Sequence, residues 1–179
     1  MKPEEFQDCL KNLEKEFKEL YTRVAPRAAG RVAVRLFKEN FRDQGFFGKR
    51  WKEVQRRRGV KGRSGKAGSR RKILTGATGD LRRSIRYTID ERGTATIFTD
   101  ASRFAHSKKP YGKVHNEGGV QYVRPHHRKL RTTGTRYQVR GYSYKMPKRQ
   151  FIGDHKVLRK AVAEEIVKKI KEIEIKQTK

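Results

Sequence analysis

The residues of this chain that are best suited to chemistry are a neighbouring histidine and asparagine, His115 and Asn116. Such a pair could serve in a nuclease, where a histidine acts as a general base or binds a metal ion. A metal-dependent nuclease would also need a second histidine and a carboxylate at workable spacing. Acidic residues are nearly absent nearby, and the remaining histidines form no recognisable ligand set: His106, His126, His127 and His155. The sequence therefore predicts no catalytic residue, no metal site and no cofactor.

The net charge limits the partners that the chain can have. Its 179 residues include 47 Lys and Arg against 19 Asp and Glu, a formal charge of +28. This excess is larger than solubility requires and indicates a polyanion or an acidic protein surface as partner. Cys9 is the single cysteine, and neither a signal-peptide core nor an apolar run of about 20 residues is present. We therefore expect a protein made and used in a reducing cytoplasm, without a membrane partner.

The positive charge is concentrated in two stretches. Residues 49–72 contain twelve Lys or Arg, one acid and four interleaved glycines, so we expect a flexible basic loop near residues 55–72. Residues 103–149 contain thirteen Lys or Arg and one acid, with a second basic loop expected near residues 120–145. Both could be solvated charge, but the excess favours contact with nucleic acid or an acidic neighbour. The candidate contact residues are Arg56, Arg57, Arg58, Arg63, Lys66, Arg70, Arg71, Arg128, Lys129 and Arg131.

The elements that position these residues are helices at both ends of the chain and strands between them. Apolar residues recur at spacings of three and four from Phe6 to Val24, and Pro26 suits the first turn of a second helix that Gly45 ends. Near the C-terminus, Asp154 could cap a helix with apolar residues along one side. These are Leu158, Val162, Ile166, Ile170 and Ile173.

In the middle of the chain the apolar period changes to two. Residues 85–89 and 94–99 flank a turn and predict a β-hairpin, and further strands are expected at residues 119–123 and 135–144. The predicted fold class is α+β, with two N-terminal helices, a central antiparallel sheet that includes the hairpin, and a C-terminal helix. No internal repeat or boundary divides the chain, so we expect a single domain over residues 1–179.

Three short motifs connect these elements. In residues 73–85, Gly76 and Gly79 permit unusual backbone conformations, Thr78 can cap a helical turn that carries Leu81, and Ser84 leads into the hairpin. An ordinary turn explains this motif without any chemistry.

The second and third motifs also have a structural explanation. In residues 111–119, we expect Tyr111 and Val114 to pack inward, His115 to make a hydrogen bond or an interface contact, and Gly118-Gly119 to turn the chain into a strand. In residues 146–153, Pro147 ends a strand, Phe151 and Ile152 anchor the connection, and Gly153 opens the last helix.

Together the three motifs resemble those of the phage virion morphogenesis family, the tail completion proteins of Mu-like phages. The family patterns are Ile-Leu followed by Thr-Gly, Leu and Ser-Ile; Tyr-x-x-aliphatic-His-Asn-x-Gly-Gly; and Pro-x-Arg-x-Phe-aliphatic-Gly. Trp51 weakly matches a family Gly-x-x-Trp segment and is expected to be a packed anchor. The matching motif residues are Leu74, Thr78, Gly79, Leu81, Ser84, Tyr111, His115, Asn116, Gly118, Gly119, Pro147, Arg149, Phe151 and Gly153.

The resemblance implies an α+β structural subunit without enzymatic activity. Such a subunit would join a homo-oligomeric ring, with sixfold symmetry as one option, at the head-proximal end of a phage or prophage tail. It would contact other neck and tail proteins and complete the tail before head-tail joining, in the virion and, during assembly, in the host bacterial cytoplasm. The basic loops exceed the family pattern; for residues 49–72 we expect an acidic neighbour, with DNA contact ranked lower because tight phosphate binding would slow genome passage.

The main alternative is a basic nucleic-acid-binding protein. Its support is the charge and the interleaving of Lys and Arg with Tyr137, Tyr142 and Tyr144. No RNA-recognition signature, zinc finger or helix-turn-helix is recognisable, so this alternative depends on electrostatics alone. A hydrolase or nuclease is the third class, with the least support.

Overall fold

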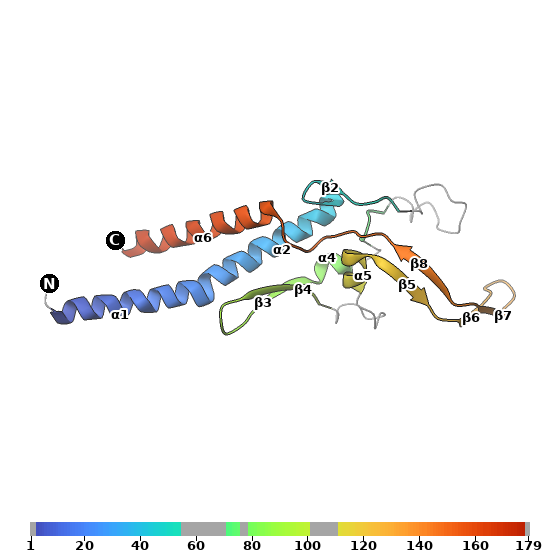
Figure 1. Cartoon of the computed structure of the whole chain (residues 1–179), viewed down its shortest axis with the longest axis horizontal. Helices are drawn as coiled ribbons and strands as arrows, with labels where there is room; N and C mark the ends of the chain where they lie inside the picture. The colour runs from blue at the N-terminus through green and yellow to red at the C-terminus, as the bar shows by residue number, and fades with distance from the viewer. Residues whose placement is uncertain (1–2, 55–70, 76–78, 101–110, 178–179) are drawn as a thin grey trace.

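The computed structural model describes residues 3–54, 71–75, 79–100 and 111–177. The molecule is elongated, with both termini at one end and a pair of long antiparallel strands projecting at the other (Figure 1). Helices, antiparallel strands and a C-terminal helix follow one another along the chain, so the predicted α+β fold class is confirmed.

The two predicted N-terminal helices are joined into one continuous rod. It consists of α1 (Pro3–Glu19), the π-helical turn η1 (Leu20–Val24) and α2 (Ala25–Asp43). The backbone N–H of Ala25 donates to Leu20 O, one residue farther back than in an α-helix. A proline has no N–H and its ring clashes with the preceding turn, so the wider turn just before Pro26 lets the rod continue.

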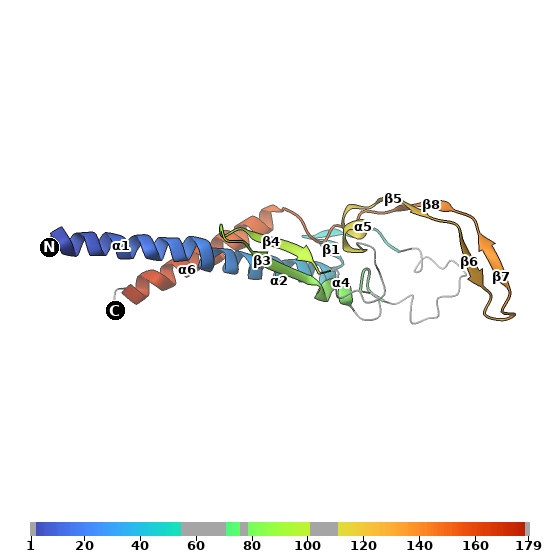
Figure 2. The ribbon, with the colours of Figure 1, turned by 90° about the horizontal axis from the view of Figure 1, so that it is seen from below.

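Helix α2 is the centre of the packing. It packs against α6 (Lys156–Gln177) and against the hairpin of β3 (Ile85–Ile89) and β4 (Ala95–Thr99), as Figures 1 and 2 show. The predicted hairpin is thereby confirmed, with Ile85 paired to Thr99. At Gly30, an added Cβ would lie 2.4 Å from the ring of Tyr87, so glycine allows α2 and β3 to approach closely.

The buried core lies where α2 ends. Its apolar members come from α2, from the segments on both sides of residues 55–70, from the first motif and from the third motif. They are Ala33, Phe37, Phe41, Trp51, Ile73, Leu74, Leu81, Ile85 and Phe151. Burial of large apolar side chains from distant segments is the main favourable contribution to this junction.

Within the described residues, the strands form four two-stranded antiparallel ladders and do not merge into one central sheet. Besides the hairpin, β1 (Gly45–Phe46) pairs with β2 (Lys49–Arg50), β5 (Gly119–Val123) with β8 (Tyr142–Met146), and β6 (His126–Lys129) with β7 (Arg136–Val139). The last two ladders form the projection that we call the β-arm, residues 119–146 (Figure 2). The basic loop expected near residues 120–145 falls on this arm.

One predicted strand is interrupted. Residues 135–144 were expected to form one run, but β7 ends at Val139 and β8 begins at Tyr142. The break contains Gly141, where an added Cβ would lie 2.4 Å from the hydroxyl of Tyr122. The close approach of Tyr122 explains why a glycine occupies this corner of the β-arm.

Two short helices and the start of α6 complete the fold. Helix α4 (Asp80–Arg83) begins after Gly79, the residue at its N-cap, and α5 (Tyr111–Glu117) precedes β5. At α6, the Val157 N–H donates to Nδ1 of His155 at 3.3 Å, so the cap comes from His155 and the expected cap by Asp154 is wrong. Asp154 instead pairs with Arg159 at 3.3 Å. The apolar residues predicted for one side of this helix are all half-buried.

Candidate functional site

The second and third motifs meet at Asn116. Its side-chain oxygen accepts hydrogen bonds from the backbone N–H groups of Phe151 at 2.9 Å and Ile152 at 3.0 Å. The backbone N–H of Arg149 donates to His115 O at 2.9 Å. Helix α5 and the segment before α6 are therefore held together by two bonds to the Asn116 side chain and one bond between main-chain groups. In this structure the Asn116 side chain thus contributes to holding the fold together.

Helix α2 joins the same junction through a second asparagine, Asn40, which the sequence analysis missed. Its amide nitrogen donates to Phe151 O at 3.2 Å, and its amide oxygen accepts from the N–H of Phe47 at 3.1 Å. Asn40 is buried within an otherwise apolar helix face. The sequence signal for this role was an asparagine on the apolar side of a predicted helix. Such a position is expected to be buried, and buried amides need hydrogen-bond partners.

Trp51 and Arg149 tie the start of the first basic stretch to the third motif. The Trp51 indole N–H donates to Gln150 O at 2.7 Å, and its ring packs edge-on against Phe41. Arg149 donates from Nε to Lys52 O at 3.0 Å and is 6% exposed. Trp51 is thus the packed anchor that the sequence predicts, and Arg149 serves as a buried structural arginine in this junction.

The other end of that stretch is fixed to the end of α2. Gln44 has a left-handed backbone, and its side-chain oxygen accepts a hydrogen bond from the N–H of Ile73. Lys72 Nζ donates to Arg42 O at 3.1 Å. Residues 55–70, which include Arg56, Arg57, Arg58, Arg63, Lys66 and Arg70, lie outside the described part of the chain. The expectation of a flexible loop there stays a prediction, while both flanks are anchored in the core.

The first motif supplies buried residues to the same junction. Leu74 and Leu81 are in the core, and Ser84 is fully buried with its hydroxyl donating to Leu81 O at 2.8 Å. The residue at the N-cap of α4 is Gly79, which has no side chain to cap the helix, and the expected cap by Thr78 stays a prediction. Thr78 itself lies outside the described residues.

The motif glycines meet specific conformational needs. Gly118 and Gly119 have φ of 74° and 109° and turn the chain from α5 into β5, as predicted. An added Cβ at Gly118 would lie 2.7 Å from the backbone nitrogen of Lys148. Gly153 has φ of 157° and precedes the start of α6, and Pro147 directly follows β8. Val114 is half-buried, whereas the side chain of Tyr111 lies outside the described atoms.

His115 is buried beside Arg149, and this placement bears on the nuclease hypothesis. Burial, and next the positive charge of Arg149, lower the pKa of His115 from 6.5 to about 4. The imidazole is therefore neutral at neutral pH and lies in the packed junction rather than in an open cleft. Within the described ranges, no group of three His, Cys, Asp or Glu side chains could hold a metal ion. The described residues give the metal-nuclease hypothesis no support.

The described candidate contact residues are all exposed, three on the β-arm and one beside the junction. Arg128 and Lys129 belong to β6, Arg131 follows it at the tip of the β-arm, and Arg71 lies beside the core; all four are exposed. Figure 1 shows that the tip of the β-arm is far from the helical end of the molecule. Of the candidate contact residues that the structure describes, three therefore lie together on the β-arm, and Arg71 lies apart from them.

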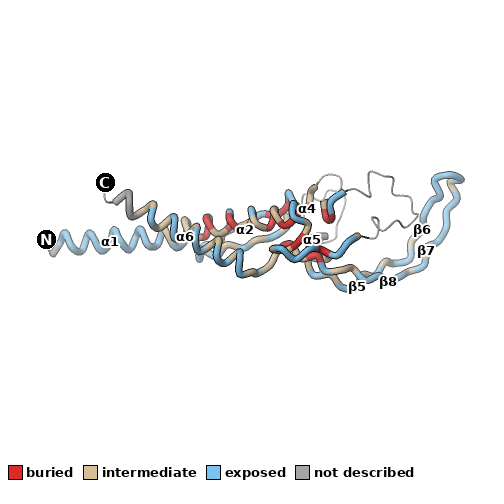
Figure 3. The backbone as a smooth tube through the Cα atoms, turned by 90° about the horizontal axis from the view of Figure 1, so that it is seen from above, coloured by how far each residue is buried: buried red, intermediate tan, exposed pale blue. Residues whose placement is uncertain are grey.

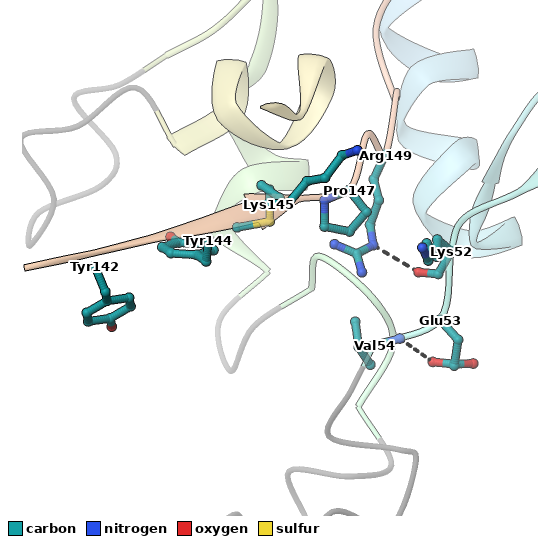
Figure 4. A pocket seen from close by; sticks show the side chains of 9 residues that line it. Lys52, Glu53, Val54, Tyr142, Tyr144, Lys145, Pro147 and Arg149 are labelled. Carbon is teal, nitrogen blue, oxygen red and sulfur yellow. Dashed lines mark hydrogen bonds between the residues drawn. The ribbon is translucent and has the colours of Figure 1, made fainter. Parts of the chain in front are cut away.

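A cleft lies where the β-arm leaves the body. Figure 4 shows Tyr142, Tyr144 and Lys145 along β8, with Arg149 reaching from the third motif toward Lys52. The cleft is lined by Lys52, Glu53, Val54, Tyr142, Tyr144, Lys145, Met146, Pro147 and Arg149. Three cations and two tyrosines line this cleft beside one acid, Glu53, and cations beside aromatic rings suit an anionic partner that can also stack on the rings.

These observations define a class of protein before they define a family. It is a small α+β protein whose described motif residues bond and pack within the fold, with exposed basic residues on the β-arm. The chain matches the phage virion morphogenesis family over residues 1–171 and belongs to that family, as its motifs predict. It is thus a phage protein of virion structure and assembly. Comparisons with curated proteins and with solved structures gave no match. No described helix is long and apolar enough to cross a membrane.

Proposed function

We propose that this protein completes the phage tail and takes part in head-tail joining as a subunit of a ring at the neck end of the tail. The observation that carries the proposal is the family match over residues 1–171. Its action is assembly by surface complementarity, without catalysis. The motif residues support this mode of action, because Asn116, Phe151 and Trp51 are used for hydrogen bonds and packing within the chain.

The shape of the molecule suits a subunit that contacts several neighbours. A ring subunit needs two different faces that recognise each other around a rotation axis. The rod of α1 and α2 ends at one extremity, and the β-arm ends at the other (Figures 1 and 3). Elements that extend so far from the core expose much surface for contacts with further copies of the chain and with other neck and tail proteins.

Disruption of the gene in the phage or prophage that encodes this chain tests the proposal. After induction, electron microscopy of the lysate should show filled heads and unattached tails as separate particles. Complementation with the intact gene should restore joined particles. Normal joined particles in the disrupted strain would overturn the proposal.

A second candidate function is binding to nucleic acid, favoured by the exposed tyrosines and cations of the β-arm. Tyr142 and Tyr144 are exposed on one face of the β5–β8 ladder, whereas Tyr122, which pairs with Ser143, is exposed on the opposite face. Tyr137 is exposed on β7, where it pairs with Arg128 of β6. Tyrosine rings beside Lys and Arg form a surface on which bases of a single strand can stack while the phosphates are neutralised. This activity is compatible with a place in the virion, where DNA passes the neck.

A further inference from the structure

The apolar side of α1 is exposed along its whole length. Phe6, Leu10, Leu13 and Phe17 are 54%, 49%, 46% and 61% exposed, and every described side chain of this helix is exposed (Figure 3). An isolated helix of this length is only marginally stable in water, and a continuous exposed apolar stripe marks an interaction site. We call residues Phe6, Leu10, Leu13 and Phe17 the α1 stripe.

Acidic side chains border the α1 stripe. With 100° of rotation per residue, the charged residues nearest the stripe are Glu14 on one side and Glu16 on the other, followed by Glu5 on the side of Glu16 and by Lys18 and Lys11 on the side of Glu14. The remaining charged residues lie on the opposite side of the helix: Glu4, Asp8, Lys15 and Glu19. The helix contains six acids and three lysines, a net charge of −3 in a chain of +28. The surface that α1 offers is therefore apolar in the middle and acidic at both edges.

A groove on α2 has the complementary character. Val34 and Tyr87 supply half-buried apolar surface, and five cations and one acid line the rest: Arg31, Arg35, Lys38, Arg42, Arg82 and Glu39. Among the described residues, no ion pair involves Arg31, Arg35, Lys38 or Arg82, and only Arg42 pairs, with its neighbour Asp43. We call this site the α2 groove.

The two surfaces also match in length. The stripe from Phe6 to Phe17 and the helical side of the groove from Arg31 to Arg42 each cover three turns, about 16 Å of helix. Within one chain they cannot meet, because α1 continues through η1 into α2 as a single rod. The occupant of the groove must come from another molecule, and a second copy of this chain carries a surface of the right length and charge.

We propose that α1 of one copy docks in the α2 groove of a second copy. The apolar stripe covers Val34 and Tyr87, and the acidic edges of α1 face the cations along the groove. Since the two surfaces are different patches, the contact is heterologous and repeats from copy to copy, so that it closes into a ring when the rotation permits. This inference rests on the proposed ring subunit and identifies the faces by which the ring is made.

Disulfide trapping tests the contact on the purified full-length chain. Cys9 is the single cysteine, is exposed, and lies three residues after Phe6 at the border of the α1 stripe. The variant Arg35→Cys adds one thiol in the groove. Mild oxidation should link Cys9 of one copy to position 35 of another and give a ladder of trimers and larger species, with the linked peptides identified by mass spectrometry.

Two controls keep the trapping specific. Lys160→Cys places the second thiol on an exposed part of α6 outside the groove, and Cys9→Ser combined with Arg35→Cys removes the α1 thiol. Both should give no ladder. A yield of the 9–35 link no higher than that of the 9–160 link would overturn the proposal, as would dominance of Cys9–Cys9 dimers, which would show that α1 pairs with α1.

Charge reversal provides a second measurement. Glu14→Lys with Glu16→Lys should lower the yield of the 9–35 link about fivefold, because like charges would then face each other. Adding Arg31→Glu and Lys38→Glu in the same chain should restore it; an unchanged yield in the first variant would contradict the proposed orientation. These experiments need no phage, so their failure is distinguishable from failure of the gene-disruption test.

Discussion

Asn116 and Phe151, which are 35 residues apart in the sequence, are joined by a hydrogen bond of 2.9 Å from the Phe151 N–H to the Asn116 side-chain oxygen. Phe151 is almost completely buried and packs edge-on against Phe41 of α2. The bond therefore connects α5, the segment before α6 and the central helix at a single point. Loss of this acceptor would affect the stability of the whole junction.

Asn116→Ala should lower the free energy of unfolding by about 1–3 kcal/mol, because two partly buried N–H groups would lose their acceptor. Asn116→Asp is the matched control, since a carboxylate keeps an acceptor oxygen at this place. Urea unfolding followed by circular dichroism measures both. Equal stability of the alanine variant and the native chain would refute the role assigned to Asn116.

Gly118→Ala should destabilise the protein by at least about 2 kcal/mol, because it combines a left-handed backbone with an overlap against the backbone of Lys148. Gly119→Ala is the control: its φ is also positive, but the added Cβ has open space around it. The melting temperature of the alanine variant at 118 should be clearly below that of the variant at 119. The reverse order would show that packing against Lys148 does not decide the stability here.

The stability of the protein should fall as the pH drops from about 6.5 to about 4. The pKa of His115 is lowered to about 4 in the folded chain, so between these values the unfolded chain binds the proton more readily than the folded one. The stabilisation present at neutral pH, at most about 3 kcal/mol, is lost through this window.

His115→Gln removes this titration and is the reference for that measurement. The difference in unfolding free energy between the two proteins, measured by urea unfolding at each pH, should change across the window, while contributions from the carboxylates cancel. A difference that stays constant from neutral pH to pH 4 would show that His115 is not held in its neutral form.

If the β-arm binds nucleic acid, the combined variant Arg128→Ser, Lys129→Ser and Arg131→Ser should weaken binding to a single-stranded DNA probe. It should also reduce the magnitude of the slope of log affinity against log salt concentration by about 2, because a phosphate contact that is lost no longer releases counterions on binding. The control neutralises three exposed lysines of α6: Lys156, Lys168 and Lys171. Equal slopes for both variants would exclude the arm tip as the binding surface.

The fold could be predicted from the sequence where local patterns decide it. The alternation from Ile85 to Ile89, the turn after it and the apolar spacing before Ile173 specify the hairpin and α6 with little help from distant residues. The joining of the N-terminal helices was not predictable in this way. Pro26 normally begins a helix, and only the π-helical turn before it lets the rod continue.

The site could be predicted only in part. The motifs placed Asn116, Phe151 and Trp51 among the important residues, but their partners come from distant segments. Asn116 bonds to Phe151 across 35 residues, and Asn40 bonds to Phe151 O across 111. The apolar period of residues 6–24 predicts a helix with one buried side, whereas the apolar side of α1 is exposed in the single chain. Periodicity shows that a helix needs a partner, and it does not show whether that partner belongs to the same chain.

The most direct test of the tail-completion role is an add-back measurement. Filled heads and tails from the gene-disrupted lysate are mixed with the purified full-length protein, and the fraction of tails joined to heads is counted by electron microscopy. The proposed function predicts that joined particles appear in proportion to the protein added and are absent without it. Joined particles in equal number with and without the protein would contradict the role in tail completion and head-tail joining.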